Sequence, residues 1–567
     1  MPDRPTLHLT LVIPGAVALG AYEAGVLTVL VNTIRASQAN GATGPRLVVD
    51  AIAGASAGAM TAALVAHILL TGATVDSLRQ AWVEDIDIDH LLDHPYPDAA
   101  LSHTIVEQIA DKFLGAPVVA PDAYRQKEPI RLVFALTNLT GRYVDWKASK
   151  QTSIGTLTYS DWIHFRMASG VPWSDADWAR VKQAALASGA VPVAFEPISI
   201  ARANDGTYVY VDGGLWDNKP LGFAIDATFN PEDLGPIDVD QCMGDEQPPG
   251  ESTERLFVIV QASAELPSTN TRLMEFTPLR VGFDALFTVP RNQTLFADLR
   301  RLEKVNSQIR WLDETVTDIC KNVNEDDPQV GALRTILLDH CRSILNEKID
   351  LKKSATEKET AVTSGAALNV RYRYDQPDGD ASEDPNRPAT LSEALRLFAK
   401  LVGGIRAKRQ IDLDVIQPAN DPRDDTRRLS GALLGDFGGF LLKQLRENDY
   451  NLGCERAREY VQGKAFAQGP DPPVYQTDAS LVDTTLSQLP PKSRLGALEG
   501  LVSAVSALAG ESNLQTRRPS FVGEVVRNLG KLPALVFAYL GFAGGCVLML
   551  ALAVAMIIVA ALVFHRT

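Results

Sequence analysis

Residues 52–59 read Ile-Ala-Gly-Ala-Ser-Ala-Gly-Ala and join an apolar run, typical of a buried strand, to a run compatible with a helix. A Gly-x-Ser-x-Gly sequence between a strand and a helix predicts a sharp turn. In such a turn the serine hydroxyl projects above the sheet, beside the free N–H groups of the helix N-terminus. Ser56 is therefore predicted to be a nucleophile, and Gly54 and Gly58 are the small residues that the turn needs. The alternative is a helix that starts with small residues and carries no chemistry.

Strand-like and helix-like runs alternate on both sides of this turn. The strand-like runs are 7–13, 47–53, 131–137, 208–211 and 255–261. Nearly continuous apolar strands separated by helical stretches are typical of a parallel or mixed sheet that helices cover on both faces. We therefore expect an α/β fold. From about residue 290 the pattern becomes mainly helical.

A serine nucleophile needs a base to take its proton. An α/β-hydrolase supplies an aspartate and then a histidine after the serine, but beyond Asp212 the remaining histidines are His340 and His565. His340 lies in a helical run, and His565 follows the apolar C-terminal segment. The sequence offers instead Asp212 at the end of a strand-like run, followed by Gly213 and Gly214, which let its loop approach another loop closely. Asp212 is the predicted base, although the same letters also fit an ordinary Asp-Gly turn.

Several motifs, in one order along the chain, resemble those of the patatin-like phospholipases, a family of acyl hydrolases that use a Ser–Asp dyad. The matching stretches are Gly54–Gly58, Thr137–Gly141, Ala187–Pro192, Asp212–Gly214 and Asn218–Pro220. The resemblance covers roughly residues 7–290. It implies a three-layer patatin-like fold with a central, mostly parallel sheet, a dyad of Ser56 and Asp212, and cleavage of fatty-acyl esters through an acyl-enzyme. It implies no metal and no cofactor.

One loop departs from the pattern of this family. After its first strand the family carries three glycines, any residue, Arg or Lys, and Gly, whereas this chain has Gly15-Ala16-Val17-Ala18-Leu19-Gly20. Backbone N–H groups of Gly15, Ala16 and Val17 would form the oxyanion hole. Val17 lacks the tolerance of glycine for positive φ, and Leu19 removes a positive charge near the site. The alternative function is therefore a catalytically impaired patatin-fold protein that acts as a membrane-tethered binding or scaffold module.

The C-terminal part of the chain carries a long apolar segment. The 33 residues from Leu532 to Phe564 include no Asp, Glu, Lys or Arg. Because ~20 apolar residues are enough for a helix to cross a bilayer, we expect one transmembrane helix at Gly541–Phe564, the alternative being a buried core helix. Basic residues precede it, at Arg517, Arg518, Arg527 and Lys531. By the positive-inside bias they place the N-terminal body in the cytoplasm, and they favour anionic lipid headgroups.

At 567 residues the chain is too long for one ordinary core, because single domains mostly end near ~250 residues. We expect a patatin-like acyl hydrolase domain at 1–290, a mainly helical extension at 291–510, a basic juxtamembrane segment at 511–540 and a transmembrane helix at 541–564. Within the extension, Gly435–Tyr450 resembles a segment of some larger bacterial patatin-like proteins, and the sequence assigns it no role.

The charge of the chain limits its partners. With 69 acidic and 54 basic side chains the net charge is −15, which disfavours nucleic acid because a phosphate surface would be repelled. The five cysteines form no Cys-x-x-Cys pair, so neither a zinc ribbon nor a disulfide framework is indicated. A solvated acidic face is expected at Glu84, Asp85, Asp87 and Asp89, the alternative being a cation site, because their spacing matches no EF-hand. The predicted partners are a membrane lipid as substrate and the membrane itself, and the sequence indicates no oligomeric state.

Overall fold

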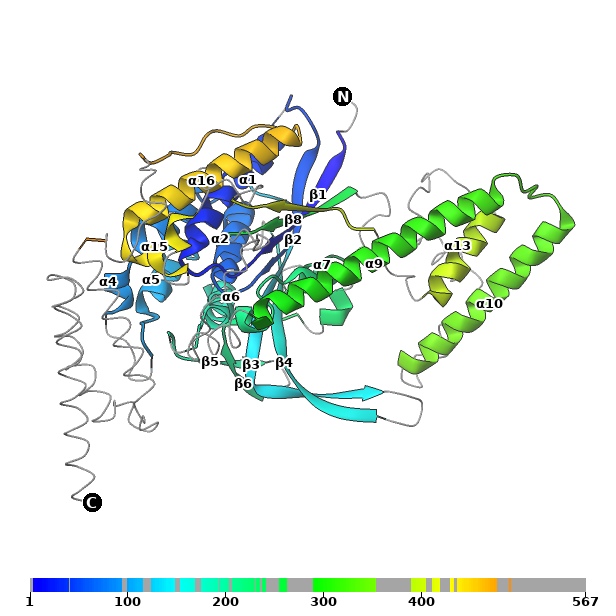
Figure 1. Cartoon of the computed structure of the whole chain (residues 1–567), viewed down its shortest axis with the longest axis horizontal. Coiled ribbons are helices and arrows are strands. Elements are labelled where there is room, and N and C mark those ends of the chain that lie inside the picture. The colour runs from blue at the N-terminus through cyan, green and yellow to red at the C-terminus, as the bar shows by residue number, and fades with distance from the viewer. Residues whose placement is uncertain are drawn as a thin grey trace, which may run out of the picture. The chain divides into compact units, whose positions relative to one another are not determined.

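The computed structural model divides the chain into two compact units, 1–243 with 257–295 and 413–567, and 244–256 with 296–412. The residues that it describes are 4–39, 41–93, 99–115, 124–147, 153–168, 175–192, 194–202, 206–229, 231–234, 237–240, 254–262, 289–352, 389–403, 410–418, 429–432, 436–476 and 489–490 (Figure 1). The predicted juxtamembrane segment 511–540 and transmembrane helix 541–564 lie outside the described residues.

The first unit is built on a nine-stranded sheet with the order β5-β6-β3-β2-β1-β8-β9, to which β4 adds beside β3 and β7 beside β4. The strands are β1 Thr6–Ile13, β2 Arg46–Gly54, β3 Ile130–Lys147, β4 Ser153–Met167, β5 Ile198–Arg202, β6 Gly206–Val211, β7 Val239–Asp240, β8 Glu254–Val260 and β9 Leu413–Ile416. Five of them coincide with the strand-like runs of the sequence. The α/β fold is therefore confirmed.

The expectation of a mostly parallel sheet is wrong. Strands β1, β2 and β3 pair in parallel, but β3 pairs with β4 and with β6 in the antiparallel sense, and so does β5 with β6. Few residues separate β3 from β4 and β5 from β6, and connections this short can join only antiparallel neighbours. The sheet is mixed, with its parallel centre carrying the turn of the serine motif.

Helices α1, α2 and α6 cover one face of the sheet and α7 packs on the other, which gives three layers (Figure 1). The helices of this unit are α1 Gly20–Ser37, α2 Ala57–Thr71, α3 Asp76–Arg79, α4 Ile88–Leu91, α5 Thr104–Phe113, α6 Asp175–Ser188, α7 Leu221–Phe229, α15 Gly438–Leu441 and α16 Lys443–Gly463. Short 3-10 helices are η1 Val17–Leu19, η3 Gly213–Leu215, η4 Pro231–Leu234 and η8 Ser430–Ala432, and η2 Gln80–Asp85 is a π-helix.

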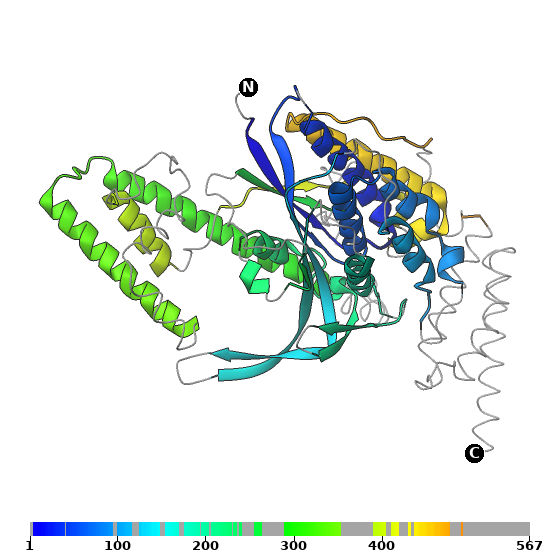
Figure 2. The ribbon, with the colours of Figure 1, turned by 180° about the vertical axis from the view of Figure 1, so that it is seen from behind.

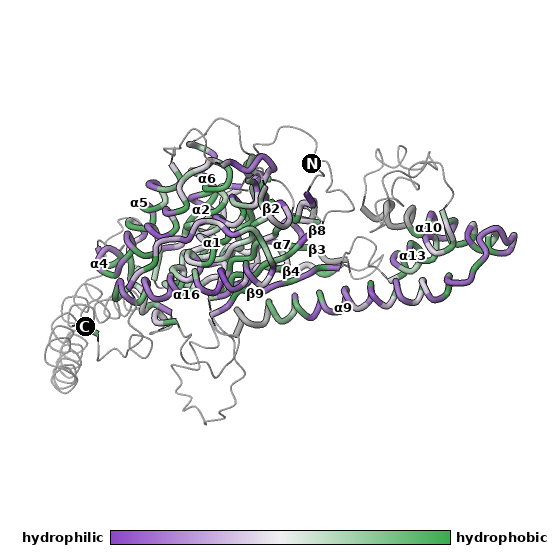
Figure 3. The backbone as a smooth tube through the Cα atoms, turned by 90° about the horizontal axis from the view of Figure 1, so that it is seen from above, coloured by the Kyte–Doolittle hydropathy of each residue, from purple (hydrophilic) through white to green (hydrophobic). Residues whose placement is uncertain are grey.

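Helix α1 lies in the core of the first unit. Together with η1 it forms the stretch Val17–Ser37, which among the described residues is long and apolar enough to cross a membrane. The fold buries 94% of its apolar window, so its composition is explained by packing inside the protein. Hydrophobic residues also dominate α2 and the central strands, whereas α9 and α10 alternate between hydrophilic and hydrophobic residues (Figure 3).

The chain returns to the first unit after residue 412. Strand β9 pairs in parallel with β8, and α16 runs along α1, as Figure 2 shows from behind. The two helices approach backbone to backbone, since a Cβ on Gly25 would overlap the carbonyl oxygen of Tyr450 and a Cβ on Gly453 would overlap that of Tyr22. The expected extension 291–510 is thus divided, because its part from 413 onward belongs to the first unit.

The second unit is helical, as expected for this part of the chain. It contains most of α9 Val289–Cys320, together with α10 Pro328–Lys352 and α13 Leu391–Val402. Helix α13 packs on α10 through an apolar cluster that includes Cys341, Leu397 and Leu401. Its N-terminus is closed by a capping box of Thr390 and Glu393.

Candidate active site

Ser56 lies in the turn between β2, which ends at Gly54, and α2, which begins at Ala57. Its backbone has φ 53° and ψ −127°, a conformation that costs a non-glycine residue about 1–3 kcal/mol and is concentrated at functional sites. A Cβ on Gly54 would lie 2.6 Å from the carbonyl oxygen of Gly58, and a Cβ on Gly58 would overlap that of Ile13. The close approach of α2 to the two strands explains why both positions carry glycine.

A second serine holds the backbone of this turn. The Ser56 N–H donates to Ser188 Oγ at 2.9 Å, and the Ser188 hydroxyl donates to the Ala135 carbonyl oxygen at 2.7 Å. Ser188 ends α6 and is fully buried. The sequence marked it only as part of the matching stretch Ala187–Pro192, and its individual role could not be read from spacing.

The hydroxyl of Ser56 meets the carboxylate that the sequence proposed as its base. Ser56 Oγ donates a hydrogen bond to Asp212 Oδ2 at 2.9 Å. Both side chains are nearly buried, with 4% and 6% of their surface exposed. A hydrogen bond at this distance is the geometry that proton transfer from a nucleophile to a base requires.

Asp212 is itself fixed on three sides. Its N–H donates to the Ala190 carbonyl oxygen at 2.9 Å, and its own carbonyl oxygen accepts from Thr137 Oγ1 at 2.8 Å. The second carboxylate oxygen, Oδ1, accepts from the Gly214 N–H at 2.5 Å, while Gly213 packs against the carbonyl of a residue in β3. One oxygen therefore holds the loop and the other faces the serine.

The predicted oxyanion loop lies beside Ser56, but one of its three amides is already used. The Gly15 N–H donates to the Asn218 carbonyl oxygen at 3.0 Å, and Asn218 Nδ2 donates back to the Gly15 carbonyl oxygen at 3.2 Å. A Cβ on Gly15 would come within 2.8 Å of Ser56 Cβ. Among the residues that the structure describes, the amides of Ala16 and Val17 have no hydrogen-bond partner. The predicted donor set is therefore reduced to these two.

Val17 adopts the conformation that its side chain was expected to resist. Its φ is 51°, in the left-handed region that a β-branched residue rarely enters. The next residues form the 3-10 helix η1, in which the Leu19 N–H donates to the Ala16 carbonyl oxygen at 2.9 Å. Glycine would adopt this backbone conformation without strain, but the loop adopts it with valine at this position.

An apolar pocket lies along α2, the helix that follows Ser56. Its lining includes Met60, Leu64, Trp82, Val106, Ile109 and Leu186, and Lys182 lies among these residues. Met60 belongs to the first turn of α2 and follows Ser56 by four residues. The Lys182 ammonium is paired with Asp111 at 2.6 Å.

Two buried histidines of the first unit pack against aromatic rings. His67 meets the ring of Trp178 edge-on at 4.9 Å, and His103 stacks on Phe195 at 4.6 Å. Burial lowers the pKa of each to about 4, so both are neutral at neutral pH. His340 lies on α10 in the second unit. The carboxylate of Asp212 is the group that the structure brings to the serine.

Comparisons with known proteins give one family match and one similar solved structure. Residues 11–225 match the family model described as Patatin-like phospholipase, a range that includes Ser56 and Asp212. The crystal structure of VipD from Legionella pneumophila is similar over 95% of this chain and 92% of its own, at 12% identity and a TM-score of 0.22. A search of curated proteins gave no significant match. The activity that accompanies the matched family is hydrolysis of lipid acyl esters. Residues 11–225 are therefore a patatin-like phospholipase domain.

Proposed function

We propose that this protein is a membrane-anchored serine lipid acyl hydrolase, of phospholipase or lysophospholipase type, in which Ser56 is the nucleophile and Asp212 the base. The observation that carries the proposal is the 2.9 Å hydrogen bond from Ser56 Oγ to Asp212 Oδ2, made at the strained turn between β2 and α2. Nucleophile and base are within transfer distance before substrate arrives.

The reaction follows from these positions. Ser56 Oγ attacks the ester carbonyl carbon as its proton passes to Asp212, and the carbonyl oxygen becomes an oxyanion held by the amides of Ala16 and Val17. The tetrahedral intermediate collapses, the C–O bond to the alcohol breaks, and Asp212 returns the proton to the leaving oxygen. Water then attacks the acyl-enzyme while Asp212 takes its proton, the fatty acid leaves, and Ser56 regains its hydrogen.

The pocket supports an acyl chain as the group that is transferred. Its lining is almost entirely aliphatic and aromatic, and it includes Met60, four residues after the nucleophile. Burying a chain there gains about 0.8 kcal/mol for each methylene group removed from water. Such a gain favours long fatty-acyl esters over short ones.

Membrane attachment is proposed from the sequence. The uncharged segment Leu532–Phe564 is long enough to hold the catalytic unit at a bilayer, and the basic residues before it favour the cytoplasmic side. A site held at the surface meets membrane lipids at a high effective concentration.

Release of fatty acid from phospholipid vesicles tests the proposed function. Ser56→Ala should abolish release, and Asp212→Asn should lower kcat by about 10³-fold or more, in line with the loss of a general base together with its orienting role. Asp217→Asn is the matched control, since Asp217 follows on the same loop and is equally buried, at 6% exposure. That variant should keep most of the rate. Full activity of Asp212→Asn would contradict the dyad.

The second candidate function is a catalytically impaired patatin-fold module that binds or scaffolds at the membrane. The strained Val17 and the commitment of the Gly15 amide to Asn218 favour it, because both weaken the predicted oxyanion hole. The two functions separate in the same assay. A folded protein that binds vesicles but releases no fatty acid from any phospholipid supports the scaffold.

A further inference from the structure

The described residues of the segment Gly435–Tyr450, to which the sequence assigned no role, lie against the predicted oxyanion loop. Three described elements from this part of the chain, η8, α15 and α16, all contact η1. They are separated from η1 by about 400 residues of sequence. The proximity results from α16 packing along α1, which directly follows η1.

Two glycines of this region touch the residues that follow Val17. A Cβ on Gly439 would lie 3.0 Å from Ala18 Cβ and 3.3 Å from the Ala18 carbonyl oxygen. A Cβ on Gly431 would lie 3.2 Å from Leu19 Cδ2. Ala18 and Leu19 are thus covered at contact distance, and Val17 packs against the apolar cluster that contains Ala18, Phe440 and Leu441. The residues just after the strained position have no room to move outward.

Two buried ionisable side chains of α16 hold these glycines in place. The Asp449 carboxylate accepts the N–H of Ser430 at 2.7 Å and that of Gly431 at 2.9 Å. Arg446 Nη1 donates to the Gly439 carbonyl oxygen at 2.7 Å. Both side chains are buried, at 1% and 2% exposure, so these bonds act without competition from solvent. Burial raises the pKa of Asp449 to about 7 and lowers that of Arg446 to about 10, so at neutral pH the guanidinium is charged and the carboxyl is only partly ionised.

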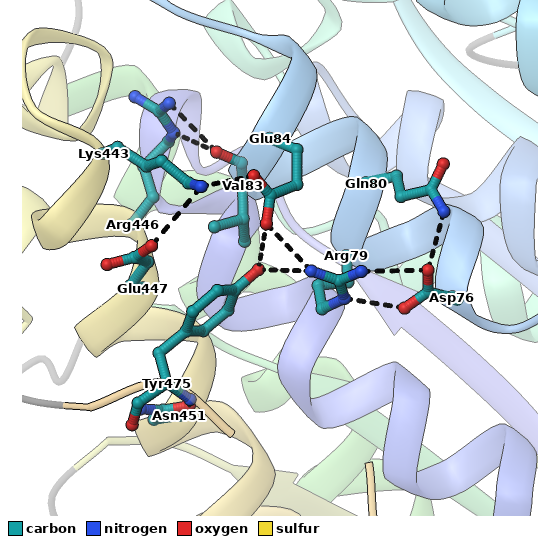
Figure 4. Close-up of polar contacts among 10 residues, drawn as sticks. All are labelled: Asp76, Arg79, Gln80, Val83, Glu84, Lys443, Arg446, Glu447, Asn451 and Tyr475. Atoms are coloured by element: carbon teal, nitrogen blue, oxygen red, sulfur yellow. Dashed lines mark hydrogen bonds and ion pairs between the residues drawn. The ribbon is translucent and has the colours of Figure 1, made fainter. Parts of the chain in front are cut away.

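The same arginine reaches the π-helix η2, which lines the apolar pocket. Arg446 Nε and Nη2 donate to the Val83 carbonyl oxygen at 3.1 and 3.0 Å (Figure 4). Figure 4 also shows Lys443 paired with Glu84, and Tyr475 between Glu84 and Arg79. The expectation of a solvated acidic face is therefore wrong at Glu84, since basic and phenolic groups surround its carboxylate. One guanidinium, that of Arg446, therefore binds both Gly439, which contacts η1, and Val83, which belongs to the π-helix that lines the pocket.

The backbone conformation of Val17 depends on support from surrounding residues, which these contacts supply. A β-branched residue at positive φ persists only where the surrounding structure holds it, at a cost of about 1–3 kcal/mol. If Ala18 and Leu19 could shift, Val17 would relax to negative φ and turn its amide away from its present direction. Glycine at this position would need no such support.

We propose that η8, α15 and the Arg446–Asp449 turn of α16 form a positioning segment that holds the oxyanion loop in its strained, donor-presenting conformation. A glycine at position 17 would adopt positive φ without support, whereas Val17 needs the contacts of this segment to keep it. Arg446 and Asp449 are positioning residues, which act on the reaction through Gly439, Gly431 and η1. The predicted effects on kcat rest on the proposed function, whereas the predicted effect on the mobility of η1 does not.

Hydrogen exchange of the full-length protein tests the contact itself, independently of catalysis. Arg446→Met should speed exchange in peptides that cover η1 by about 10-fold or more, because local opening becomes easier. Arg456→Met is the matched control. Arg456 is a buried arginine of the same helix, but it donates to the Gln417 carbonyl oxygen, away from η1. Equal exchange of η1 in the two variants would overturn the proposal.

A kinetic cycle with Val17→Gly tests the consequence for the reaction. In the wild-type background Arg446→Met should lower kcat at least about 10-fold with little change in KM, since a displaced oxyanion donor acts on the transition state. In the Val17→Gly background the loss should shrink to within about 3-fold, because the loop no longer needs support. The same loss in both backgrounds would overturn the proposal.

A gentler variant covers the case in which Arg446→Met does not fold. Gly439→Ala keeps every hydrogen bond but adds a methyl group 3.0 Å from Ala18 Cβ, so it displaces η1 directly. It should lower kcat several-fold in wild type and less with Val17→Gly, and an unchanged kcat would count against the proposal. A wild-type protein without hydrolysis would refute the proposed function, while the exchange experiment would still decide the role of the segment.

Discussion

At the scale of single residues, the site depends on two hydrogen bonds made by Ser56. The Ser56 N–H donates to Ser188 Oγ, and the Ser56 hydroxyl donates to the Asp212 carboxylate. The sequence predicted the Ser56–Asp212 pair from motif letters. It could not predict the Ser188 bond, because a hydroxyl at the end of α6 reaches Ser56 only through the packing of α6 on β3. Nor could it show that the Gly15 amide is used by Asn218, which comes from a loop about 200 residues later.

Ser188→Ala should lower the rate without removing a catalytic group. The variant leaves the Ser56 N–H and the Ala135 carbonyl oxygen without their partner, and an unmade buried hydrogen bond costs about 1–3 kcal/mol. We expect kcat to fall about 10-fold with KM nearly unchanged, since the turn that carries Ser56 loses its support. Ser188→Thr, which keeps the hydroxyl, should recover part of the rate. Equal rates for Ser188→Ala and wild type in the vesicle assay would refute this role.

At the scale of secondary-structure elements, α1 is the most constrained helix of the fold. Most of its residues are buried, including Glu23, whose two carboxyl oxygens have no hydrogen-bond partner among the described residues. Burial raises the pKa of Glu23 well above its ordinary value. A glutamate on an otherwise apolar helix would be expected from sequence to face solvent. The return of α16 along α1 explains why it does not.

Glu23→Gln should change how stability depends on pH. The folded protein keeps the proton on Glu23, whereas the unfolded chain releases it above a pKa of about 4.3. The contribution of Glu23 is thus fully present below that value and is lost as pH rises, by up to about 1.4 kcal/mol per pH unit. The melting temperature of Glu23→Gln, relative to wild type, should rise between about pH 5 and pH 8.

The exposed residue Glu107, on α5, provides the control for this exchange of side chains. Glu107→Gln should leave the melting temperature close to wild type at each pH, because folding leaves an exposed carboxylate in water and changes its pKa little. A difference between Glu23→Gln and wild type that stays constant with pH would show that Glu23 is ionised in the folded protein.

The elements themselves were predicted where their pattern is strong. The runs that became β1, β2 and β8 are buried and nearly continuous in apolar residues, so their type could be read directly. Strand β9 was missed, because four residues within a helical region carry too little pattern. The antiparallel partners β4 and β5 were missed as well, since alternation of polar and apolar residues on their exposed parts is weak. Long-range pairing, and not local propensity, decides such strands.

At the scale of the whole molecule, the chain combines a mixed α/β unit with a helical unit inserted between β8 and β9. The sequence predicted the patatin-like domain and the helical character of the region that follows it. It could not predict that the chain returns to add β9 and α16 to the first unit, because a strand partner about 150 residues away leaves no local signal. The same return brings Arg446 to the oxyanion loop.

Removal of residues 532–567 should separate membrane attachment from catalysis. We expect the full chain to sediment with membranes, and the truncated chain to stay in the supernatant, because the uncharged segment supplies the apolar length for a bilayer helix. The truncated chain should still cleave a dispersed ester of a fatty acid but should act more slowly on vesicles. Sedimentation of the truncated chain with membranes would place the attachment elsewhere.

The central claim, that Ser56 is an activated nucleophile, can be tested by covalent capture. A fluorophosphonate probe reacts with a serine whose hydroxyl is paired with a base, and mass spectrometry of the digested protein locates the adduct. We predict one adduct, on the peptide that contains Ser56, with labelling lost in Ser56→Ala and strongly slowed in Asp212→Asn. A folded wild-type protein that takes no label at Ser56, or that is labelled equally fast in Asp212→Asn, would contradict the account.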